Sequence, residues 1–237
     1  MIPWLRPTDP PDAFPPVFDA LDEPDGLLCV GGDLSPARLL AAYRRGIFPW
    51  YSEGQPILWW SPDPRSVLFP GELRVTRSLA KTIRNRGYIV TRDRAFAGVM
   101  NLCGDGTLRP EGTWISPDMR AAYARLHALG HAHSVETWLD GRLVGGLYGV
   151  ALGRVFFGES MFSTERDASK VALHDLVQSL RTSNVELIDC QIASPHLESL
   201  GARAIPRRDF VAHLERCITD LRPVPGWPGP HAPGNGN

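Results

Sequence analysis

The order of apolar and polar positions from residue 112 onward predicts alternating helices and strands. Helical segments repeat apolar residues three and four positions apart, whereas strand-like segments are short apolar runs. The expected helices are residues 117–130, 167–182, 195–200 and 207–221, and the expected strands are residues 134–139, 142–151, 154–159 and 187–191. Asp140 and Gly141 form a strong hairpin turn between the first two strands. A hairpin followed by a helix, a strand and a helix predicts an α+β fold with a mixed sheet and flanking helices.

The N-terminal third is interrupted by proline and glycine and predicts shorter elements. Ser35 is a suitable N-cap, Pro36 suits the first helical position and Gly46 suits the stop, so a helix is expected at residues 36–45. Two aromatic-rich segments follow at residues 46–51 and 58–64, and their prolines allow only short strands or loops.

These patterns predict two domains. A small α/β domain is expected at residues 1–65, with an end that the sequence places between residue 65 and about residue 110. A larger domain is expected at residues 66–222. The last segment, residues 223–237, is rich in Pro, Gly and Asn and is expected to be disordered.

Composition indicates a cytoplasmic protein without a metal site. The cysteines are scattered without a CxxC pair, at Cys29, Cys103, Cys190 and Cys217. His131 and His133 lack a third ligand at a telling spacing and are interpreted as packing residues. The proline-rich N-terminus is no signal peptide, and no apolar run approaches the length of a membrane span. Because phosphate-loop, dinucleotide and zinc-protease motifs are absent from the sequence, no cofactor is expected.

Positive charge is concentrated between Arg74 and Arg94. This segment has seven basic residues and one acid, a net charge of +6 in a chain whose net charge is −1. Arg77, Lys81 and Arg84 are spaced to line one face of a helix. That face is either merely solvated or contacts the phosphates of a nucleic acid.

The segment Leu187-Ile188-Asp189-Cys190-Gln191 places two polar side chains in an apolar strand. Side chains alternate along a strand, so Asp189 and Gln191 are expected on one face, roughly 7 Å apart, with Cys190 in the core opposite. Burying unpaired polar groups costs a few kcal/mol. The pair is therefore either hydrogen-bonded inside the fold or part of a cavity wall.

Two further groups of residues suggest a binding site. Glu159 follows an apolar run and is expected where a strand leaves the core, beside Met161 and Phe162, which could wall an apolar pocket. Four tryptophans lie in loop-like contexts, namely Trp50, Trp59, Trp60 and Trp114. Tryptophans in loops beside a basic segment are either core filler or surfaces on which unpaired bases stack.

These segments together resemble the leucyl/phenylalanyl-tRNA–protein transferases over nearly the whole chain. The most specific matches are RGIFPW at 45–50, LWWSPDPR at 58–65, GESMFS at 158–163 and LIDCQ at 187–191. Further matches are GLLCVGGDLS at 26–35, GTWI at 112–115, GHAHS at 130–134 and IPRRD at 205–209. The resemblance implies a small N-terminal α/β domain followed by a domain similar to GCN5-related N-acetyltransferases.

The resemblance also implies an activity. Such enzymes move leucine or phenylalanine, with methionine as a further candidate, from aminoacyl-tRNA to the N-terminal Arg or Lys of an acceptor protein. The product is marked for degradation by the N-end rule. The implied partners are aminoacyl-tRNA and acceptor proteins, with no membrane.

The resemblance assigns roles to individual residues. Asp189 and Gln191 are expected at the reacting centre, where Gln191 orients the attacking amine, and Asp189 holds Gln191 and favours departure of the proton from the amine. The ribose 2′ hydroxyl of the tRNA is the alternative carrier of the proton. The implied substrate-binding residues are Trp50 and Trp114 at the terminal adenosine, Glu159 near the aminoacyl-adenosine end, and Met161, Leu173 and Leu176 around the amino-acid side chain. Ser160 and Phe156 are further expected substrate-binding residues. Arg77, Lys81 and Arg84 are the expected tRNA contacts.

The alternative classes of protein are a CoA-dependent acetyltransferase and a non-enzymatic RNA-binding module. A CoA-dependent acetyltransferase needs a glycine-rich pyrophosphate loop that opens a helix, and the nearest match, residues 142–147, lies in a predicted strand. A non-enzymatic RNA-binding module would account for the tryptophans and the basic segment, but it gives no reason for Asp189 and Gln191.

Overall fold

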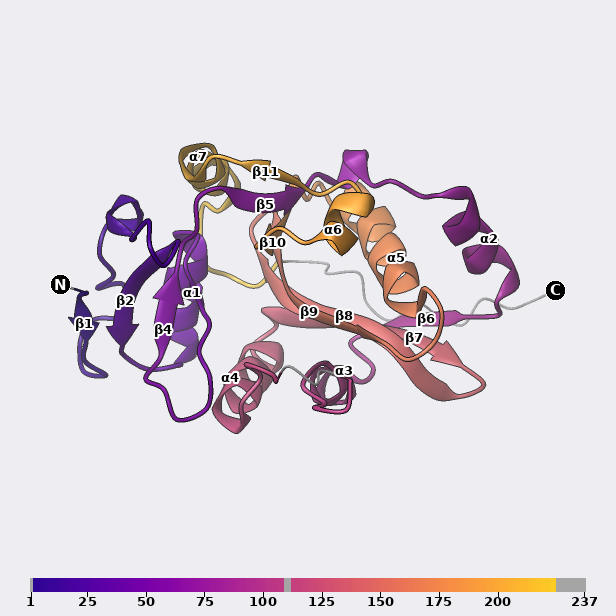
Figure 1. Ribbon diagram of the computed structural model, residues 1–237, viewed down its shortest axis with the longest axis horizontal. Helices are drawn as coiled ribbons and strands as arrows, with labels where there is room; N and C mark the ends of the chain where they lie inside the picture. Colours follow the sequence, from indigo (N-terminus) through magenta and orange to yellow (C-terminus); the bar gives the residue numbers. More distant parts are fainter. Residues whose placement is uncertain (1, 109–111, 225–237) are drawn as a thin grey trace.

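The computed structural model describes residues 2–108 and 112–224, which form two β-sheets with flanking helices (Figure 1). The smaller sheet has the strand order β1-β2-β4-β3. Its strands are β1 (Trp4–Leu5), β2 (Leu27–Gly31), β3 (Phe48–Pro49) and β4 (Leu58–Trp60). The mixed α+β class expected from the sequence is confirmed, whereas the proposed domain boundary at residue 65 stays a prediction.

The larger sheet has the strand order β11-β5-β10-β9-β8-β7-β6. Its strands are β5 (Arg65–Leu68), β6 (Ile89–Arg92), β7 (Ala132–Leu139), β8 (Arg142–Leu152), β9 (Val155–Ser163), β10 (Leu187–Gln191) and β11 (Arg203–Ile205). Neighbouring strands are antiparallel except for β9 and β10, which run parallel. The sheet therefore continues in sequence order from β6 to β10 and is extended by β5 and β11.

Helices cover both faces of the larger sheet. In Figure 1, α3 (Phe96–Cys103) and α4 (Pro117–Ala128) lie below it, and α5 (Ala168–Thr182) lies above it with α6 (Pro195–Ser199). The remaining helices are α1 (Pro36–Arg44), α2 (Arg77–Asn85), α7 (Arg207–Cys217) and the 3-10 turns η1 (Val17–Asp19) and η2 (Pro70–Glu72). Two apolar clusters form the core, and α5 supplies much of one of them.

Local sequence signals account for most of these boundaries. The side chains of Ser35 and Ser116 accept hydrogen bonds from the backbone amides at the starts of α1 and α4, and proline occupies the first turn of both helices. Two expectations were inaccurate. The helix expected at 207–221 ends at Cys217, because Ile218 leaves helical geometry with φ −118° and ψ 89°. The strand expected at 154–159 continues to Ser163, because it stays paired with β8 as far as Gly145.

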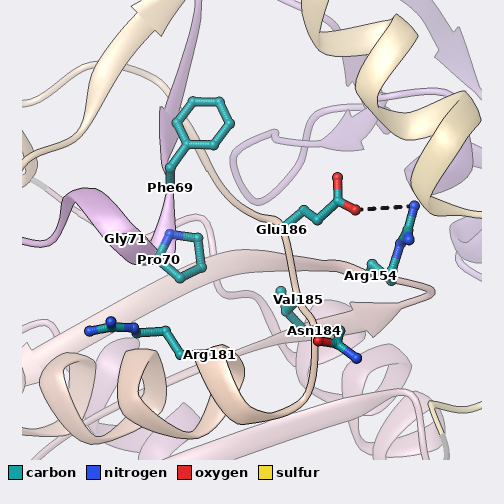
Figure 2. Close-up of a pocket in the computed structure, with 8 residues that line it drawn as sticks. All are labelled: Phe69, Pro70, Gly71, Arg154, Arg181, Asn184, Val185 and Glu186. Carbon is teal, nitrogen blue, oxygen red and sulfur yellow. Dashed lines mark ion pairs between the residues drawn. The ribbon is translucent and has the colours of Figure 1, made fainter.

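The connection between α5 and β10 passes a cavity of about 490 Å³ (Figure 2). In this cavity Arg154 forms an ion pair with Glu186 at 3.2 Å, and both side chains are largely exposed. None of the residues predicted to act in catalysis or binding lines it. Exposed ion pairs of this kind contribute little to stability.

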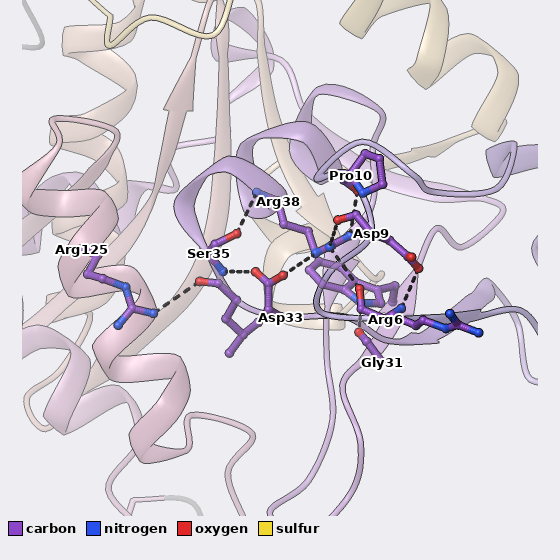
Figure 3. Close-up of polar contacts among 10 residues, drawn as sticks. Arg6, Asp9, Pro10, Gly31, Asp33, Ser35, Arg38 and Arg125 are labelled. Atoms are coloured by element: carbon purple, nitrogen blue, oxygen red, sulfur yellow. Dashed lines mark hydrogen bonds and ion pairs between the residues drawn. The ribbon is translucent and has the colours of Figure 1, made fainter.

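The N-terminal segment is held to the smaller sheet by the buried Arg38 (Figure 3). Its guanidinium donates to Asp33 Oδ2 at 3.0 Å and to the backbone oxygens of Asp9 at 2.8 Å, Pro10 at 3.2 Å and Arg6 at 3.4 Å. A guanidinium presents five donors in a rigid plane, whereas a lysine ammonium has three and lacks the fork. Arg38 therefore connects helix α1 to the segment that precedes it.

We predict that Arg38→Lys lowers the free energy of unfolding by about 2–4 kcal/mol, because several buried acceptors lose their donor. Urea unfolding followed by circular dichroism measures this change. Arg44→Lys on the same helix is the matched control, since Arg44 is exposed, and should change stability by less than about 0.5 kcal/mol. Equal effects of the two variants would show that the buried contacts of Arg38 contribute nothing specific.

Candidate functional site

The site forms where strands β9 and β10 part. Their parallel pairing runs from Leu187 opposite Val155 to Asp189 opposite Phe157 and ends there. Beyond this point, each strand has a β-bulge against the strand on its other side. Glu159 is the extra residue of β9 opposite β8, and Cys190 is the extra residue of β10 opposite β5. Bulges of this kind bend a strand and redirect its side chains, and here they border a cavity.

The cavity has a volume of about 730 Å³ and is lined by residues of strands β5, β8, β9 and β10, of helices α5 and α6, and of the loops that carry Trp50 and Trp114. All ten residues expected to act in catalysis or substrate binding line it: Trp50, Trp114, Phe156, Glu159, Ser160, Met161, Leu173, Leu176, Asp189 and Gln191. The sequence segments that carry them are up to 141 positions apart, from Trp50 to Gln191. The structure brings these ten residues together around one cavity, and the role of each residue stays a prediction.

One part of the cavity is apolar. It is built from Leu68, Leu147, Phe156, Met161, Leu173, Leu176 and Ile188. Leu176 and Phe156 are almost completely buried, and Leu173 is 5% exposed. Concave apolar surfaces with a few polar groups are typical of small-molecule sites. This wall can take an apolar side chain.

Two tryptophans border the same cavity. Trp50 is 42% exposed and its ring lies 5.8 Å from that of Trp60, whose indole nitrogen donates to the Trp50 carbonyl at 2.6 Å. Trp114 is half-buried. Trp59, by contrast, is fully buried in β4 and donates to the Gly31 carbonyl at 2.8 Å. The loop-like context expected for Trp59 and Trp60 is therefore wrong, because both belong to a strand of the smaller sheet.

Glu159 is buried at the polar end of the cavity among neutral donors. Its Oε1 accepts from the Tyr43 hydroxyl at 2.7 Å and from Gln191 Nε2 at 3.1 Å, and its Oε2 accepts from the Tyr123 hydroxyl at 2.9 Å. The two tyrosine hydroxyls also contact each other. Within residues 2–108 and 112–224, no cationic side chain forms an ion pair with Glu159. The position expected for Glu159 at a strand end is corrected to a bulge within β9.

This environment changes the acidity of the whole cluster. Burial raises the pKa of Glu159 from 4.5 to about 7, and the negative charge of Asp189 adds to the increase, although the three hydrogen bonds oppose it. Burial and the charge of Glu159 raise the pKa values of Tyr43 and Tyr123 well above 10. Both phenols therefore stay neutral donors, while Glu159 can gain or lose a proton near neutral pH.

Asp189 has a different environment from Glu159 although both are buried. Its carboxylate receives two hydrogen bonds from Arg65, from Nε to Oδ1 at 2.8 Å and from Nη2 to Oδ2 at 2.7 Å. The Arg65 side chain is 1% exposed and that of Asp189 is 0% exposed. A paired fork of this geometry is the strongest kind of carboxylate contact. The polar pair expected in this strand is thus a hydrogen-bonded pair and also part of a cavity wall.

The alternation expected across Asp189, Cys190 and Gln191 is wrong because of the bulge. Gln191 has a left-handed backbone with φ 61°, and its amide donates to Asp189 Oδ1 at 2.9 Å. Its carboxamide is held by Glu159 and not by Asp189. Cys190 was expected in the core but lines the cavity, and burial raises the pKa of its thiol to about 12. A thiol that stays protonated is a poor nucleophile.

The basic residues lie apart from the cavity. Arg77, Lys81 and Arg84 are exposed on α2, which is capped by Thr76 and packs against α5. Figure 1 shows α2 on the outer side of α5, away from the smaller sheet. The segment that the sequence marked as basic divides into α2 and β6, so only part of its charge is on a helix.

Of the two histidines interpreted as packing residues, His133 has a side-chain partner. His133 Nδ1 lies 2.8 Å from Asp93 Oδ2, which agrees with packing and hydrogen bonding. In the described part of the chain, no three His, Cys, Asp or Glu residues are arranged to hold a metal ion. Among the same residues, no helix combines the length and apolar character needed to cross a bilayer. The expected disordered tail lies almost entirely outside the described residues.

Three residues of the site were missed by the sequence reasoning. Tyr43 and Tyr123 have the spacing of core residues in their helices, and Arg65 ends a proline-rich segment that was interpreted as a loop or a short strand. The available signal was that Arg65 is the last residue of LWWSPDPR, one of the segments of the family resemblance. Their partners are distant in sequence, so only the folded chain identifies them.

Comparison with protein families gives two matches that together cover most of the chain. The family described as leucyl/phenylalanyl-tRNA protein transferase matches residues 67–215. The N-terminal domain of leucyl/phenylalanyl-tRNA protein transferase matches residues 32–63. The segment without a match between them, residues 64–66, includes the first residues of β5.

Curated relatives agree over nearly their full length. A leucyl/phenylalanyl-tRNA–protein transferase from Azoarcus sp. (strain BH72) is 61% identical over 229 residues, covering 97% of this chain and 96% of the relative. One from Methylococcus capsulatus is 55% identical over 236 residues, covering 99% of both chains. Among solved structures, a GCN5-related N-acetyltransferase from Kribbella flavida is 12% identical with a TM-score of 0.37, covering 71% of this chain and 60% of that one.

The raised pKa of Glu159 predicts a pH-dependent stability. A carboxyl whose pKa is about 7 when folded and 4.5 otherwise binds its proton more tightly in the folded state. Its contribution is therefore complete below pH 4.5 and is lost as the pH rises through 7. Between pH 5 and pH 8, this group should lower the free energy of unfolding by about 2–3 kcal/mol.

Urea unfolding of wild type and Glu159→Gln at both pH values measures this contribution. The variant has no proton to lose, so its stability should fall less between pH 5 and pH 8. Glu53→Gln, which changes an exposed glutamate, should retain the wild-type response. An identical response in Glu159→Gln and wild type would contradict the prediction.

Proposed function

The chain belongs to the leucyl/phenylalanyl-tRNA–protein transferase family, and we propose that it joins leucine or phenylalanine from aminoacyl-tRNA to the N-terminal Arg or Lys of acceptor proteins. The observation that carries this proposal is one cavity with an apolar wall, a polar end at Glu159 and Gln191, and two tryptophans at its border. Each part fits one component of an aminoacyl ester. We further propose that the product is marked for degradation by the N-end rule and that the reaction occurs in the cytoplasm.

The apolar wall fits the side chain of the transferred amino acid. Leucine, phenylalanine and methionine are unbranched at Cβ and apolar, and the wall offers Met161, Leu173 and Leu176 around such a group. Methionine side chains adapt to ligands of different shape. One pocket can therefore accept both an aliphatic and an aromatic side chain, whereas a charged side chain would lose its hydration there.

Trp50 and Trp114 are assigned to the terminal adenosine of the tRNA. Stacking of a base on an aromatic ring contributes about 1–3 kcal/mol. Trp50 is partly exposed and already rests against Trp60, so its ring is pre-positioned for a ligand. Holding the adenosine at the border would direct the ester carbonyl towards the polar end of the cavity.

Gln191 is assigned to the attacking amine. Because its Nε2 donates to Glu159, its carbonyl oxygen is the group left to accept a hydrogen bond from the α-amine of the acceptor. That amine has an ordinary pKa of about 7.7–8.0, so a useful fraction is neutral at pH 7. The negative charge behind Gln191 makes its oxygen a stronger acceptor and favours a cationic acceptor residue.

The reaction is aminolysis of an ester. The amine nitrogen attacks the carbonyl carbon, the bond to the ribose 3′ oxygen breaks, and a proton from the nitrogen ends on that oxygen. A carboxamide is too weak a base to keep this proton, so Gln191 acts by positioning. The 2′ hydroxyl of the ribose is adjacent to the leaving oxygen and can carry the proton within the substrate.

The decisive experiment measures transfer directly. The purified protein, incubated with radiolabelled leucyl-tRNA, should label a peptide that begins with Arg and should not label the same peptide with an acetylated α-amine. Gln191→Glu should lower the single-turnover rate at saturating donor by about 10²-fold or more, because it places a second carboxylate beside Glu159.

Gln178→Glu makes the same chemical change at an exposed position of α5 and is the matched control. Its transfer rate should equal that of wild type, and thermal melts should show that both variants are folded. If the wild-type protein leaves the Arg peptide unlabelled, the proposed activity is wrong.

The exposed basic face of α2 is assigned to the tRNA backbone. Reversing charge at Arg77, Lys81 and Arg84 together should raise the KM for leucyl-tRNA and spare transfer from leucyl-adenosine, which lacks the phosphates. When tRNA binding is measured across salt concentrations, the slope of log K against log salt should be smaller in magnitude by about 2–3 in the variant than in wild type, since each phosphate contact contributes about 0.7–0.9.

Arg208→Glu on α7 is the control, because Arg208 is also exposed but lies on a different helix. Its salt dependence should match that of wild type. An unchanged slope in the α2 variant would mean that this face is only solvated.

A further inference from the structure

Arg65 occupies an unusual place behind the strand that carries Gln191. It is the first residue of β5, and its side chain is 1% exposed. Its guanidinium packs on two aromatic rings, 4.8 Å from the centroid of Phe48 in β3 and 4.6 Å from that of Phe210 in α7. These contacts come from the smaller sheet and from helix α7, so two distant parts of the chain pack against one charged group.

The three guanidinium nitrogens of Arg65 each donate a hydrogen bond. Nε and Nη2 donate to the two oxygens of Asp189, and Nη1 donates to the Gly46 carbonyl at 3.1 Å. The three acceptors and the two rings together hold the guanidinium in one orientation, and the fork fixes the orientation of the Asp189 carboxylate. Lysine could replace the charge but neither the fork nor the stacking.

Asp189 transmits this orientation to Gln191. Its Oδ1, the oxygen that accepts from Arg65 Nε, also accepts the backbone amide of Gln191 at 2.9 Å. Gln191 has φ 61°, a left-handed conformation that is unfavourable for residues other than glycine and persists where the surroundings hold it. The same residue then reaches Glu159 with its carboxamide.

We propose that Arg65 is a positioning residue for the transfer reaction, acting through Asp189 to hold the backbone of Gln191 so that its carboxamide meets the attacking amine. This inference rests on the proposed function. It assigns Asp189 an anchoring role, with both oxygens engaged by Arg65. A displacement of about 1 Å at a reacting group can reduce a rate by about 10²-fold, so a loosened anchor should reduce turnover and leave donor binding intact.

The first test is Arg65→Lys, assayed by single-turnover transfer from saturating leucyl-tRNA to an Arg peptide. We expect the rate to fall by about 10–10²-fold, with a donor Kd within about threefold of wild type. A folded variant with the wild-type rate would overturn the proposal, and so would equal losses in donor affinity and rate.

The second test separates positioning from general support of the fold. If Arg65 acts through Gln191, then Arg65→Lys should cause little further loss in a Gln191→Ala background, because the carboxamide it positions is already gone. Effects of the two substitutions that simply multiply would show independent roles and would overturn the proposal.

Phe210→Leu keeps the ion pair but removes one ring from the guanidinium, so it tests the same chain of contacts if Arg65→Lys does not fold. It should lower the rate less than Arg65→Lys and should also lose its effect in the Gln191→Ala background. Phe69→Leu is the matched control. The Phe69 ring contacts Arg203 in a similar cation–π pair, with 4.5 Å from the guanidinium carbon to the ring centroid, and Phe69 does not line the cavity. A Phe210→Leu effect that multiplies with Gln191→Ala, or no effect, would overturn the proposal.

The wild-type protein distinguishes failure of the proposed function from failure of the positioning role of Arg65. If it does not transfer leucine at all, the proposed function fails before Arg65 is tested. If it transfers leucine and Arg65→Lys, or Phe210→Leu in its place, behaves as a matched control, only the positioning role fails.

Discussion

The parting of two parallel strands is the constraint on which the site depends. Strands β9 and β10 share hydrogen bonds only as far as Phe157 and Asp189, and beyond that point the backbone groups that face the gap need other partners. The two bulges, at Glu159 and Cys190, turn side chains into the gap. The apolar wall, the polar end and the border of tryptophans are all arranged around this opening.

Two buried carboxylates border the opening and differ in what compensates their charge. Asp189 receives a guanidinium fork, whereas Glu159 receives only neutral donors, two phenols and a carboxamide. Cation pairing favours the charged form of a carboxyl, and burial without a cation favours the protonated form. Asp189 is therefore suited to anchor strand β10, whereas Glu159 is suited to gain or lose a proton in the cavity.

The smaller sheet contributes to the site as well as to the fold. Helix α1 supplies Tyr43 to Glu159, strand β3 supplies Phe48 to Arg65, and the residue after β3 is Trp50 at the border of the cavity. Gly46, which has φ +75°, lies close to Phe210, and its carbonyl accepts a hydrogen bond from the same guanidinium. The two sheets thus share one apolar cluster and one site, which explains why the site residues are spread over nearly the whole chain.

The sequence by itself determined most elements after residue 112, the α+β class and ten of the residues that line the cavity. Helix caps at Ser35 and Ser116, the hairpin at Asp140 and Gly141, and the short apolar runs are local signals, and they predicted most elements after residue 112. The ten cavity residues were named because they lie in the segments that resemble a known family, in the apolar run just before one of them, or in the helix that follows it. Tertiary structure decided the partners. Tyr43 is 116 positions from Glu159, and Arg65 is 124 positions from Asp189, so no local pattern relates them. It also decided that Gln191 turns towards Glu159, because a bulge depends on pairing with another strand and is invisible in the alternation of a single segment.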